Sequence, residues 1–243
     1  MIDWPSRYGR HVLESVDSTL DEAVRRLPVQ GPEWILAKRQ TRARGRRGRS
    51  WSMQIGNFAG TLILPVAEPP ALVALRSFVA SLALREACIA ATGREDVFSL
   101  KWPNDVLLRG CKLAGILLER LDQDHLAIGI GVNLVAAPRP DQVEPGAVPP
   151  VALNTIGHKI APEDFLNLLA DAYARYEDQF TTFGFAPIRA AWLSHAARLG
   201  EVITARTNQV EMSGTFADVD ETGQLVLETP KGRVPIPAAD VYF

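Results

Sequence analysis

Short apolar stretches recur through the first half of the chain and predict β-strands. Continuous apolar runs between turn residues are typical of buried strands, and alternating runs of strands with one buried face. The predicted strands are residues 11–16, 34–37, 58–64, 98–102, 106–108, 112–119 and 126–134. The dipeptide Arg109-Gly110 is the expected tip of a hairpin between two of these strands.

Segments with helical spacing separate the strands. The predicted helices are residues 17–27, 68–91, 162–183 and 187–197. In the first, Thr19 and Glu22 fit a capping box, with Ser18 or Asp17 as alternative caps. In the second, apolar residues at helical spacing predict a stripe that faces the core. That stripe consists of Leu72, Leu75, Val79 and Leu82.

The pattern changes near residue 199, where only short strands and turns follow. These predicted strands are residues 202–205, 212–218, 225–228 and 233–236. A segment of this length suits a small β-barrel. Because strands and helices are interspersed before it, we expect a mixed α/β (α+β) domain over residues 1–197 and a β domain over residues 198–243.

Composition excludes several classes of protein. The chain has 243 residues, is 47% apolar and 22% charged, and carries a net charge of -2, so it can build a large core. Two cysteines indicate no disulfide framework, and four distant histidines show no metal-ligand spacing. No signal peptide is visible, and charged residues interrupt the most apolar stretch, 71–91. We therefore expect a cytoplasmic protein that does not insert into a membrane.

A concentrated basic run changes this picture. Seven of the twelve residues from Lys38 to Arg49 are basic and none is acidic, with Gly45 and Gly48 inside the run. Arginine pairs through two nitrogens with phosphate or carboxylate, and glycine lets a backbone come close to a ligand. The run predicts a loop that closes over an anion. The plainer alternative is a solvated basic loop that binds nucleic acid weakly or nothing at all.

Lys101 lies in an unusual setting. In the alternating strand 98–102, Ser99 and Lys101 share one face, and Leu100 and Trp102 flank the lysine. An ammonium above a pocket could neutralise a carboxylate and then the phosphate that becomes attached to it. The plainer alternative is an edge-strand lysine that discourages aggregation.

Three further features are compatible with a ligand site. Asp17-Ser18-Thr19 could present hydroxyls to a polar ligand, although a helix cap explains it equally well. Gly115, Gly129 and Gly131 suggest strands against which a ligand or another backbone packs, with a β-bulge as the alternative. No Walker phosphate loop and no catalytic triad can be argued from the spacing.

The order of the motifs is more specific than any one of them. Residues 17–134 contain D-S-T, Q-T-x-x-R-G-R-x-G-R-x-W, K-W-P-N-D, K-L-A-G-I-L-L-E and G-I-G-V-N. In this order they resemble the biotin–protein ligases, and the C-terminal segment is similar to the small SH3-like β-barrel that ends that family. The resemblance implies a catalytic domain like that of class II aminoacyl-tRNA synthetases, with a mixed sheet and flanking helices.

The resemblance implies an activity and a set of site residues. Family members join biotin to ATP, form biotinoyl-5'-AMP, and transfer the biotinoyl group to a lysine of a biotin carboxyl carrier domain of a carboxylase such as acetyl-CoA carboxylase. The implied biotin-binding residues are Ser18, Thr19, Gln40, Arg44, Gly45, Arg46, Lys101 and Gly115. The implied ATP and adenylate residues are Arg44, Arg46, Trp51, Asn104, Lys112 and Asn133.

Arg46 and Lys101 are the expected catalytic residues. A carboxylate that attacks the α-phosphate brings two anions together, and these cations with Mg²⁺ would offset the repulsion. No metal ligands can be identified from the sequence. No nucleophilic side chain is needed, and a covering loop would protect the adenylate from water.

Two positions depart from the family pattern. The usual D-S-T-N has Leu20 in its last place, and the glycine expected before the first loop arginine is Ala43. Leu20 either removes a polar contact near biotin or shows that the contact is dispensable. Ala43 restricts the start of the loop slightly.

The resemblance also bears on partners. About ten residues precede the first predicted strand, too few for a helix-turn-helix module, so we expect no specific DNA binding. A homodimer is one expectation, in which the edge of strand 126–134 could pair across subunits. The competing hypotheses are a lipoate ligase, which shares the catalytic fold, and a nucleic-acid-binding module without enzymatic activity.

Overall fold

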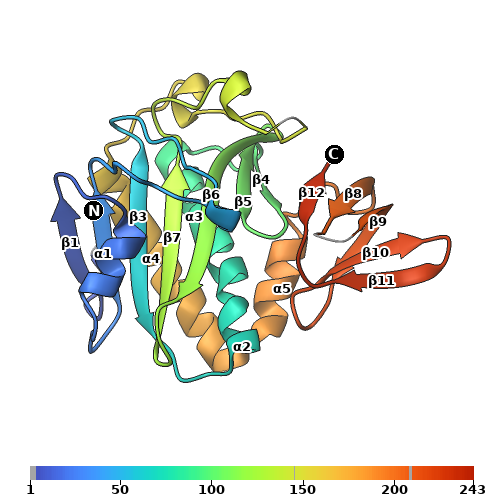
Figure 1. Cartoon of the computed structure of the whole chain (residues 1–243), viewed down its shortest axis with the longest axis horizontal. Coiled ribbons are helices and arrows are strands. Elements are labelled where there is room, and N and C mark those ends of the chain that lie inside the picture. Colours follow the sequence, from blue (N-terminus) through green and yellow to red (C-terminus); the bar gives the residue numbers. More distant parts are fainter. Residues whose placement is uncertain (1–3, 145, 208–209) are drawn as a thin grey trace.

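A seven-stranded mixed sheet forms the centre of the larger part of the molecule (Figure 1). The computed structural model describes residues 4–144, 146–207 and 210–243. The proline-rich segment 138–150 is expected from its composition to be a loop, and its Pro145 lies outside the described residues. The strand order is β1-β2-β3-β7-β6-β5-β4. The bounds are β1 Gly9–Leu13, β2 Glu33–Ala37, β3 Phe58–Pro65, β4 Phe98–Lys101, β5 Asp105–Leu108, β6 Cys111–Arg120 and β7 His125–Val132. Among these seven described strands, β1 and β2 pair in parallel, and the other neighbouring strands pair antiparallel.

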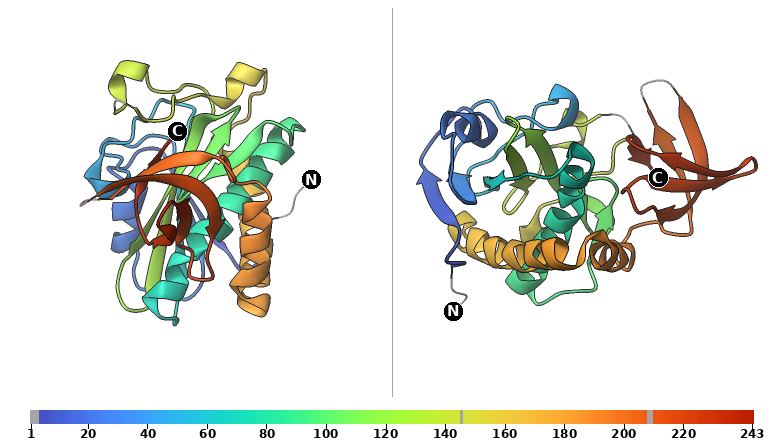
Figure 2. Two further views of the ribbon diagram at one scale, coloured as in Figure 1. Left: turned by 90° about the vertical axis from the view of Figure 1, so that its right-hand side faces the viewer. Right: turned by 90° about the horizontal axis from the view of Figure 1, so that it is seen from below.

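Helices cover both faces of this sheet, as Figures 1 and 2 show. The α-helices are α1 Thr19–Arg25, α2 Pro70–Ala74, α3 Arg76–Thr92, α4 Pro162–Phe183 and α5 Phe185–Leu193. The short 3₁₀ helices are η1 Arg46–Gly48, η2 Pro140–Gln142 and η3 Leu153–Ile156. Alternation along β2 explains the arrangement, because Trp34 belongs to the large core cluster with α3 and α4, whereas Ile35 packs with α1. Helix α1 covers part of its face of the sheet, and the rest of that face borders a cavity.

A second, antiparallel sheet follows α5 and curves strongly (Figure 2). Its order is β11-β10-β9-β8-β12, and its bounds are β8 Val202–Arg206, β9 Glu211–Val219, β10 Leu225–Thr229, β11 Gly232–Ile236 and β12 Asp240–Tyr242. It is joined to the first part by side chains such as Trp102, whose Nε1 donates to the carbonyl of Gly223 at 3.1 Å. The predicted mixed α/β part and all-β segment are thus confirmed. The strand β12 was missed by the sequence patterns.

The start of α1 differs from the predicted capping box. Ser18 is the N-cap, and its hydroxyl accepts a hydrogen bond from the Leu20 amide at 3.2 Å. Thr19 lies inside the helix, and its hydroxyl donates to Gln40 instead. The Thr19 and Glu22 capping box was therefore wrong, because Thr19 has a tertiary partner that the local pattern cannot reveal.

The second predicted helix is split. Its first turn is the separate short helix α2, and α3 begins after Leu75. Leu72, which belongs to α2, lies outside the core with 47% exposure. The other three residues of the predicted stripe, Leu75, Val79 and Leu82, are buried. Helix α3 ends where Gly93 adopts the left-handed conformation, at φ 68°.

The proposed pairing of strand 126–134 across subunits is also wrong. That strand is β7, and β3 and β6 occupy both of its edges. Among the described residues, no helix combines the length and the apolar character that a membrane crossing requires.

Candidate active site

One cavity brings the predicted site residues together. It has a volume of about 760 Å³ and lies on the face of the first sheet that also carries α1. All twelve residues named above line it, although they come from segments far apart in sequence. They are Ser18, Thr19, Gln40, Arg44, Gly45, Arg46, Trp51, Lys101, Asn104, Lys112, Gly115 and Asn133.

Glycines make the floor of this cavity. Gly115 of β6 pairs directly with Gly131 of β7, so the two lie side by side on the sheet. A Cβ built at Gly131 would lie 2.5 Å from Cε2 of Trp51, far too close for a real contact. The register of β7 with both neighbours runs without a shift. The alternative of a β-bulge is therefore wrong for Gly129 and Gly131, whereas on the other edge of β6 the register with β5 shifts at Leu113, two residues before Gly115. The glycines allow close packing above the sheet.

Uncharged side chains form one end of the cavity, which we call the neutral end (Ser18, Thr19, Leu20 and Gln40), and Thr61 lies behind it. The Gln40 side-chain oxygen accepts from the Thr19 amide at 2.7 Å and from the Thr19 hydroxyl at 3.1 Å. The Thr61 hydroxyl, which is fully buried in β3, donates to the Thr19 hydroxyl at 2.8 Å. Thr61 was missed, although a lone hydroxyl in the apolar run 58–64 was a signal that it needs a partner.

Leu20 belongs to this end as an apolar neighbour. It is 4% exposed, and a Cβ built at Gly129 would lie 3.2 Å from its side chain. It packs in the small cluster that includes Ala23, Ile35 and Ala127. The departure at this position thus places an apolar side chain over Gly129, where it also lines the cavity.

The basic run forms a loop along one wall. The Trp51 amide donates to the Ala43 carbonyl at 3.0 Å and the Gly45 amide to the Arg49 carbonyl at 2.7 Å. Ala43 does not have a positive φ, so its side chain is accommodated without backbone strain. Arg44 pairs with Glu119 at 2.7 Å and with Asp21 at 2.6 Å. Carboxylates from other elements therefore anchor the start of the loop.

Asp240 of β12 anchors the other side of the loop. Its Oδ2 lies 2.7 Å from Arg47 and 2.8 Å from Arg49, and its Oδ1 lies 3.8 Å from Arg46. Burial opposes the charged form, but the arginines outweigh it, so the pKa of Asp240 is lowered. No sequence pattern pointed to Asp240, because the signal for its three-residue strand was weak. The loop is thus an ion-paired wall, unlike the freely solvated loop considered as an alternative.

Lys101 and Lys112 flank a second carboxylate. Lys101 is 8% exposed, and its Nζ lies 3.9 Å from Oδ2 of Asp105, its partner across the β4–β5 hairpin. Lys112 Nζ lies 2.7 Å from Oδ1 of the same residue. Burial lowers the pKa of Lys101 despite Asp105. We call Arg46, Lys101, Asp105, Lys112 and Asp240 the charged end.

Lys101 is not the exposed edge-strand lysine considered as the alternative. The free edge of β4 is covered, because the Leu100 amide donates to the His195 carbonyl at 2.8 Å. The buried ammonium lies above the cavity at the limit of an ion pair. Arg46 is similar, since burial lowers its pKa and its nearest polar contact is Oδ1 of Asn104 at 3.4 Å. Both cations are therefore available to an anion.

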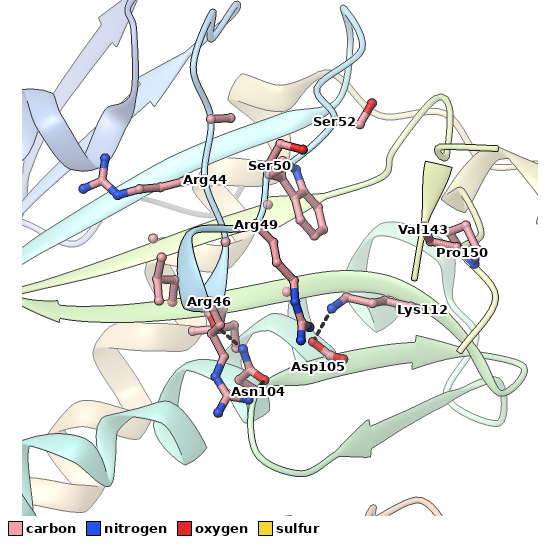
Figure 3. A pocket seen from close by; sticks show the side chains of 18 of the residues that line it. Arg44, Arg46, Arg49, Ser50, Ser52, Asn104, Asp105, Lys112, Val143 and Pro150 are labelled. Carbon is pink, nitrogen blue, oxygen red and sulfur yellow. Dashed lines mark hydrogen bonds and ion pairs between the residues drawn. The ribbon is translucent and has the colours of Figure 1, made fainter. Parts of the chain in front are cut away.

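Two asparagines complete the lining. Asn104 donates to the Ile116 carbonyl and accepts from Arg46, so it ties the K-W-P-N-D turn to β6. Asn133 donates to the Val151 carbonyl at 3.2 Å, and among the described residues its buried Oδ1 has no hydrogen-bond partner. Figure 3 shows Arg46 beside Asn104 and Lys112 directed at Asp105, while Arg44 points away from both pairs.

Comparisons with known proteins agree with this site. Residues 11–133 match the profile of the biotin/lipoate A/B protein ligase family, and residues 199–243 match the biotin protein ligase C terminal domain. The chain is 51% identical to the biotin--[acetyl-CoA-carboxylase] ligase of Paracoccus denitrificans, over 96% of this chain and 99% of that one. The chain belongs to the biotin protein ligase family.

Other family members support the assignment. The bifunctional ligase/repressor BirA of Bacillus subtilis is 33% identical, and the match covers 95% of this chain and 71% of that protein. The biotin protein ligase of Aquifex aeolicus in complex with biotin and ATP superposes with a TM-score of 0.84 at 27% identity. That match covers 96% of this chain and 97% of the Aquifex chain. The class II synthetase-like fold expected from the resemblance is confirmed.

Proposed function

We propose that the protein is an ATP-dependent biotin ligase that makes biotinoyl-5'-AMP and transfers the biotinoyl group to a lysine of a biotin carboxyl carrier domain. One observation carries the proposal. A single cavity joins the neutral end to the charged end, and within the described residues the ion pairs of Lys101 and Arg46 are long, at 3.9 and 3.8 Å. Such a cavity suits a ligand with an uncharged polar head and an anionic tail.

The neutral end would hold the ureido ring of biotin. Ser18, Thr19 and Gln40 supply hydrogen-bonding groups, and Leu20 over Gly129 supplies apolar contact. The valerate chain would pass the backbone of Gly115 toward Lys101. Arg44 and Gly45 would act through the loop, which they position above the ligand.

ATP would lie at the charged end. The buried Oδ1 of Asn133 lacks a donor in the described structure, and the amino group of adenine would supply one. Trp51, lying on Gly131, would stack on the adenylate. Lys112 and Asn104 would line its phosphate and ribose side, supported by their positions in the cavity.

The first step would join two anions. The biotin carboxylate oxygen attacks the α-phosphorus, the bond from that phosphorus to the bridging oxygen breaks, and pyrophosphate leaves. Arg46 and Lys101 would stabilise the negative charge that develops on the α-phosphate, a contribution that is largest where water is excluded. Their incomplete pairing means that they need not first leave a strong internal ion pair.

Mg²⁺ was expected with ATP, and the site fits it only in part. Among the described residues, no group of three metal-ligating side chains exists, and the carboxylates that line the cavity are Asp105, Glu144 and Asp240. Mg²⁺ is often held by one or two carboxylates plus phosphate oxygens and waters. Asp105, which lies between Lys101 and Lys112, would be the protein ligand. The ion would supply charge neutralisation on the phosphates.

In the second step the carrier lysine amine attacks the acyl carbonyl of the adenylate. The new amide forms, the bond from the carbonyl carbon to the phosphate oxygen breaks, AMP leaves and the amine loses a proton. Proximity is the main requirement of this step. We assign this chemistry to a catalytic domain of residues 1–197, with residues 198–243 as the C-terminal β domain. Asp240 of the C-terminal β domain supports the catalytic domain, because it pairs with Arg47 and Arg49 of the basic loop.

A transfer assay tests the proposal. The protein is mixed with biotin, ATP, MgCl₂ and a purified carrier domain of acetyl-CoA carboxylase, and the carrier is weighed by mass spectrometry. We expect the addition of one biotinoyl group that requires ATP. A carrier of unchanged mass in the presence of folded enzyme would refute the proposal. Replacing biotin by lipoate tests the alternative of a lipoate ligase.

Other expectations stay predictions. Specific DNA binding is not expected, and a preference below ~10³-fold for any one DNA sequence over random DNA would agree with that. A homodimer can be tested by sedimentation, and a cytoplasmic location by fractionation of the source cells.

A further inference from the structure

Thr61 has no role in the proposed chemistry, yet its hydroxyl is fully buried and hydrogen-bonded to a residue of the cavity. It lies at the centre of β3, is fully buried, and sits opposite Gly129 of β7 in the sheet. It does not line the cavity itself. A buried hydroxyl in an apolar strand is costly unless it has a partner, and here that partner is the Thr19 hydroxyl at 2.8 Å.

Hydrogen counting fixes the direction of this chain of hydrogen bonds. The Gln40 side-chain oxygen can only accept, so the hydroxyl proton of Thr19 must point to it. The Thr19 hydroxyl then has no proton for Thr61, and Thr61 must be the donor. The chain therefore runs from Thr61 through Thr19 to Gln40 in one direction.

This direction decides what Gln40 offers to a ligand. Its oxygen already accepts from the amide and the hydroxyl of Thr19. The amide nitrogen of Gln40 carries two protons. In the described structure it donates to the Met53 sulfur at 3.8 Å, which is a weak acceptor. At least one N–H of Gln40 thus remains for an acceptor inside the cavity.

We propose that Thr61 is a positioning residue for substrate selection: by donating to Thr19 it holds the Gln40 amide with its N–H groups toward the ligand, which favours a cyclic urea head over an apolar ring. The proposal rests on the proposed function and deepens it. A urea carbonyl is a strong acceptor, whereas the dithiolane ring of lipoate has none. A neutral relay of this kind acts on the head of the substrate and leaves ATP binding unchanged.

The test compares Thr61→Val, which keeps the shape but removes the hydroxyl, with Thr61→Ser, which keeps the hydroxyl. Biotin affinity is measured by calorimetry, and KM and kcat are measured with biotin and ATP. We expect Thr61→Val to weaken biotin binding about tenfold, as expected for one lost hydrogen bond that leaves a partner unsatisfied. KM for ATP and kcat stay within twofold, and Thr61→Ser stays near the parent in every measurement.

Selectivity gives a second reading. Inhibition by lipoate should be unchanged in Thr61→Val, so the preference for biotin over lipoate falls about tenfold. Desthiobiotin, which keeps the urea, should weaken in parallel with biotin. If Thr61→Val does not fold, Thr61→Ala is compared with Thr61→Ser in the same way.

Two results would overturn the proposal. One is biotin affinity within twofold of the parent in Thr61→Val. The other is an equal loss in Thr61→Val and Thr61→Ser, which would indicate packing alone. A parent that binds biotin but transfers none would refute the proposed function and leave this binding test intact.

Discussion

The two ends of the cavity are built from different interactions. The neutral end is uncharged and, apart from the half-buried Gln40, buried, and each of its hydrogen bonds has a single possible direction. The charged end is crossed by ion pairs from three arginines to Asp240, and these pairs are partly exposed. Recognition of the biotin head therefore relies on rigid groups, whereas binding of the ATP phosphates relies on charges that can exchange one anion for another.

Removal of a cation from the charged end should have the largest effect. Lys101→Ala and Arg46→Ala should each lower kcat for transfer by roughly 10²–10³-fold, the usual loss when one group that stabilises a transition-state charge is removed. Lys231→Ala, an exposed lysine in the β10–β11 hairpin, is the matched control and should stay near the parent. Near-normal kcat in both site variants would mean that the charged end is not where chemistry occurs.

The neutral end can be disturbed through its apolar member. Leu20→Asn should lower the free energy of unfolding by about 2–3 kcal/mol, because it leaves a void and buries an amide over Gly129. Urea denaturation measures the change. Val24→Asn, on the same helix at 52% exposure, should change stability by less than about 0.5 kcal/mol. Equal effects of the two changes would show that Leu20 does not pack as described.

The anchoring of the loop can be tested by proteolysis. Asp240→Asn removes the shared partner of Arg47 and Arg49, so trypsin should cut the 42–53 loop several times faster in the ligand-free protein. Glu211→Gln, which affects an exposed pair with Arg206 in the same sheet, is the control. Saturating biotin and ATP should slow cleavage of the variant. An unchanged cleavage rate in Asp240→Asn would show that Asp240 does not anchor the loop.

A small pH effect should separate the two ends. Burial lowers the pKa of Lys101 below the ordinary 10.5, while Asp105 and Asp240 oppose the shift. Activity that needs the ammonium is therefore complete below that pKa and falls as pH rises through it. Asp240→Asn removes one opposing carboxylate, so the alkaline fall in kcat should move to lower pH. The affinity for biotin amide, which keeps the cyclic urea head but lacks the carboxylate that would meet Lys101, should stay constant across the same range, because the neutral end has no titrating side chain.

Local sequence patterns predicted most of the first sheet and the cavity wall. The strand 58–64 and the helix 162–183 follow directly from apolar periodicity and from proline at the helix start. The order of the motifs, through the family resemblance, predicted all twelve site residues. They meet in one cavity, although Ser18 and Asn133 are 115 positions apart in the sequence. Periodicity alone could not have brought them together.

What was missed depends on tertiary contacts. Thr19 was assigned as a cap because its spacing to Glu22 is right, yet the fold gives its hydroxyl to Gln40. Asp240 lies in a three-residue strand that is defined only by pairing with β8. Burial also depends on tertiary contacts that the residue type does not reveal. The polar Thr61 is buried, and the apolar Leu72 is exposed.

Formation of the adenylate can be measured directly in the absence of a carrier domain. The protein is incubated with biotin, ATP and MgCl₂, separated from free ligands by rapid gel filtration, and the bound fraction is analysed by mass spectrometry. We predict about one biotinoyl-5'-AMP per chain, with pyrophosphate released in equal amount only when biotin is present. Pyrophosphate release that does not depend on biotin, or active protein that retains no adenylate, would contradict the claim that one cavity joins the vitamin to the nucleotide.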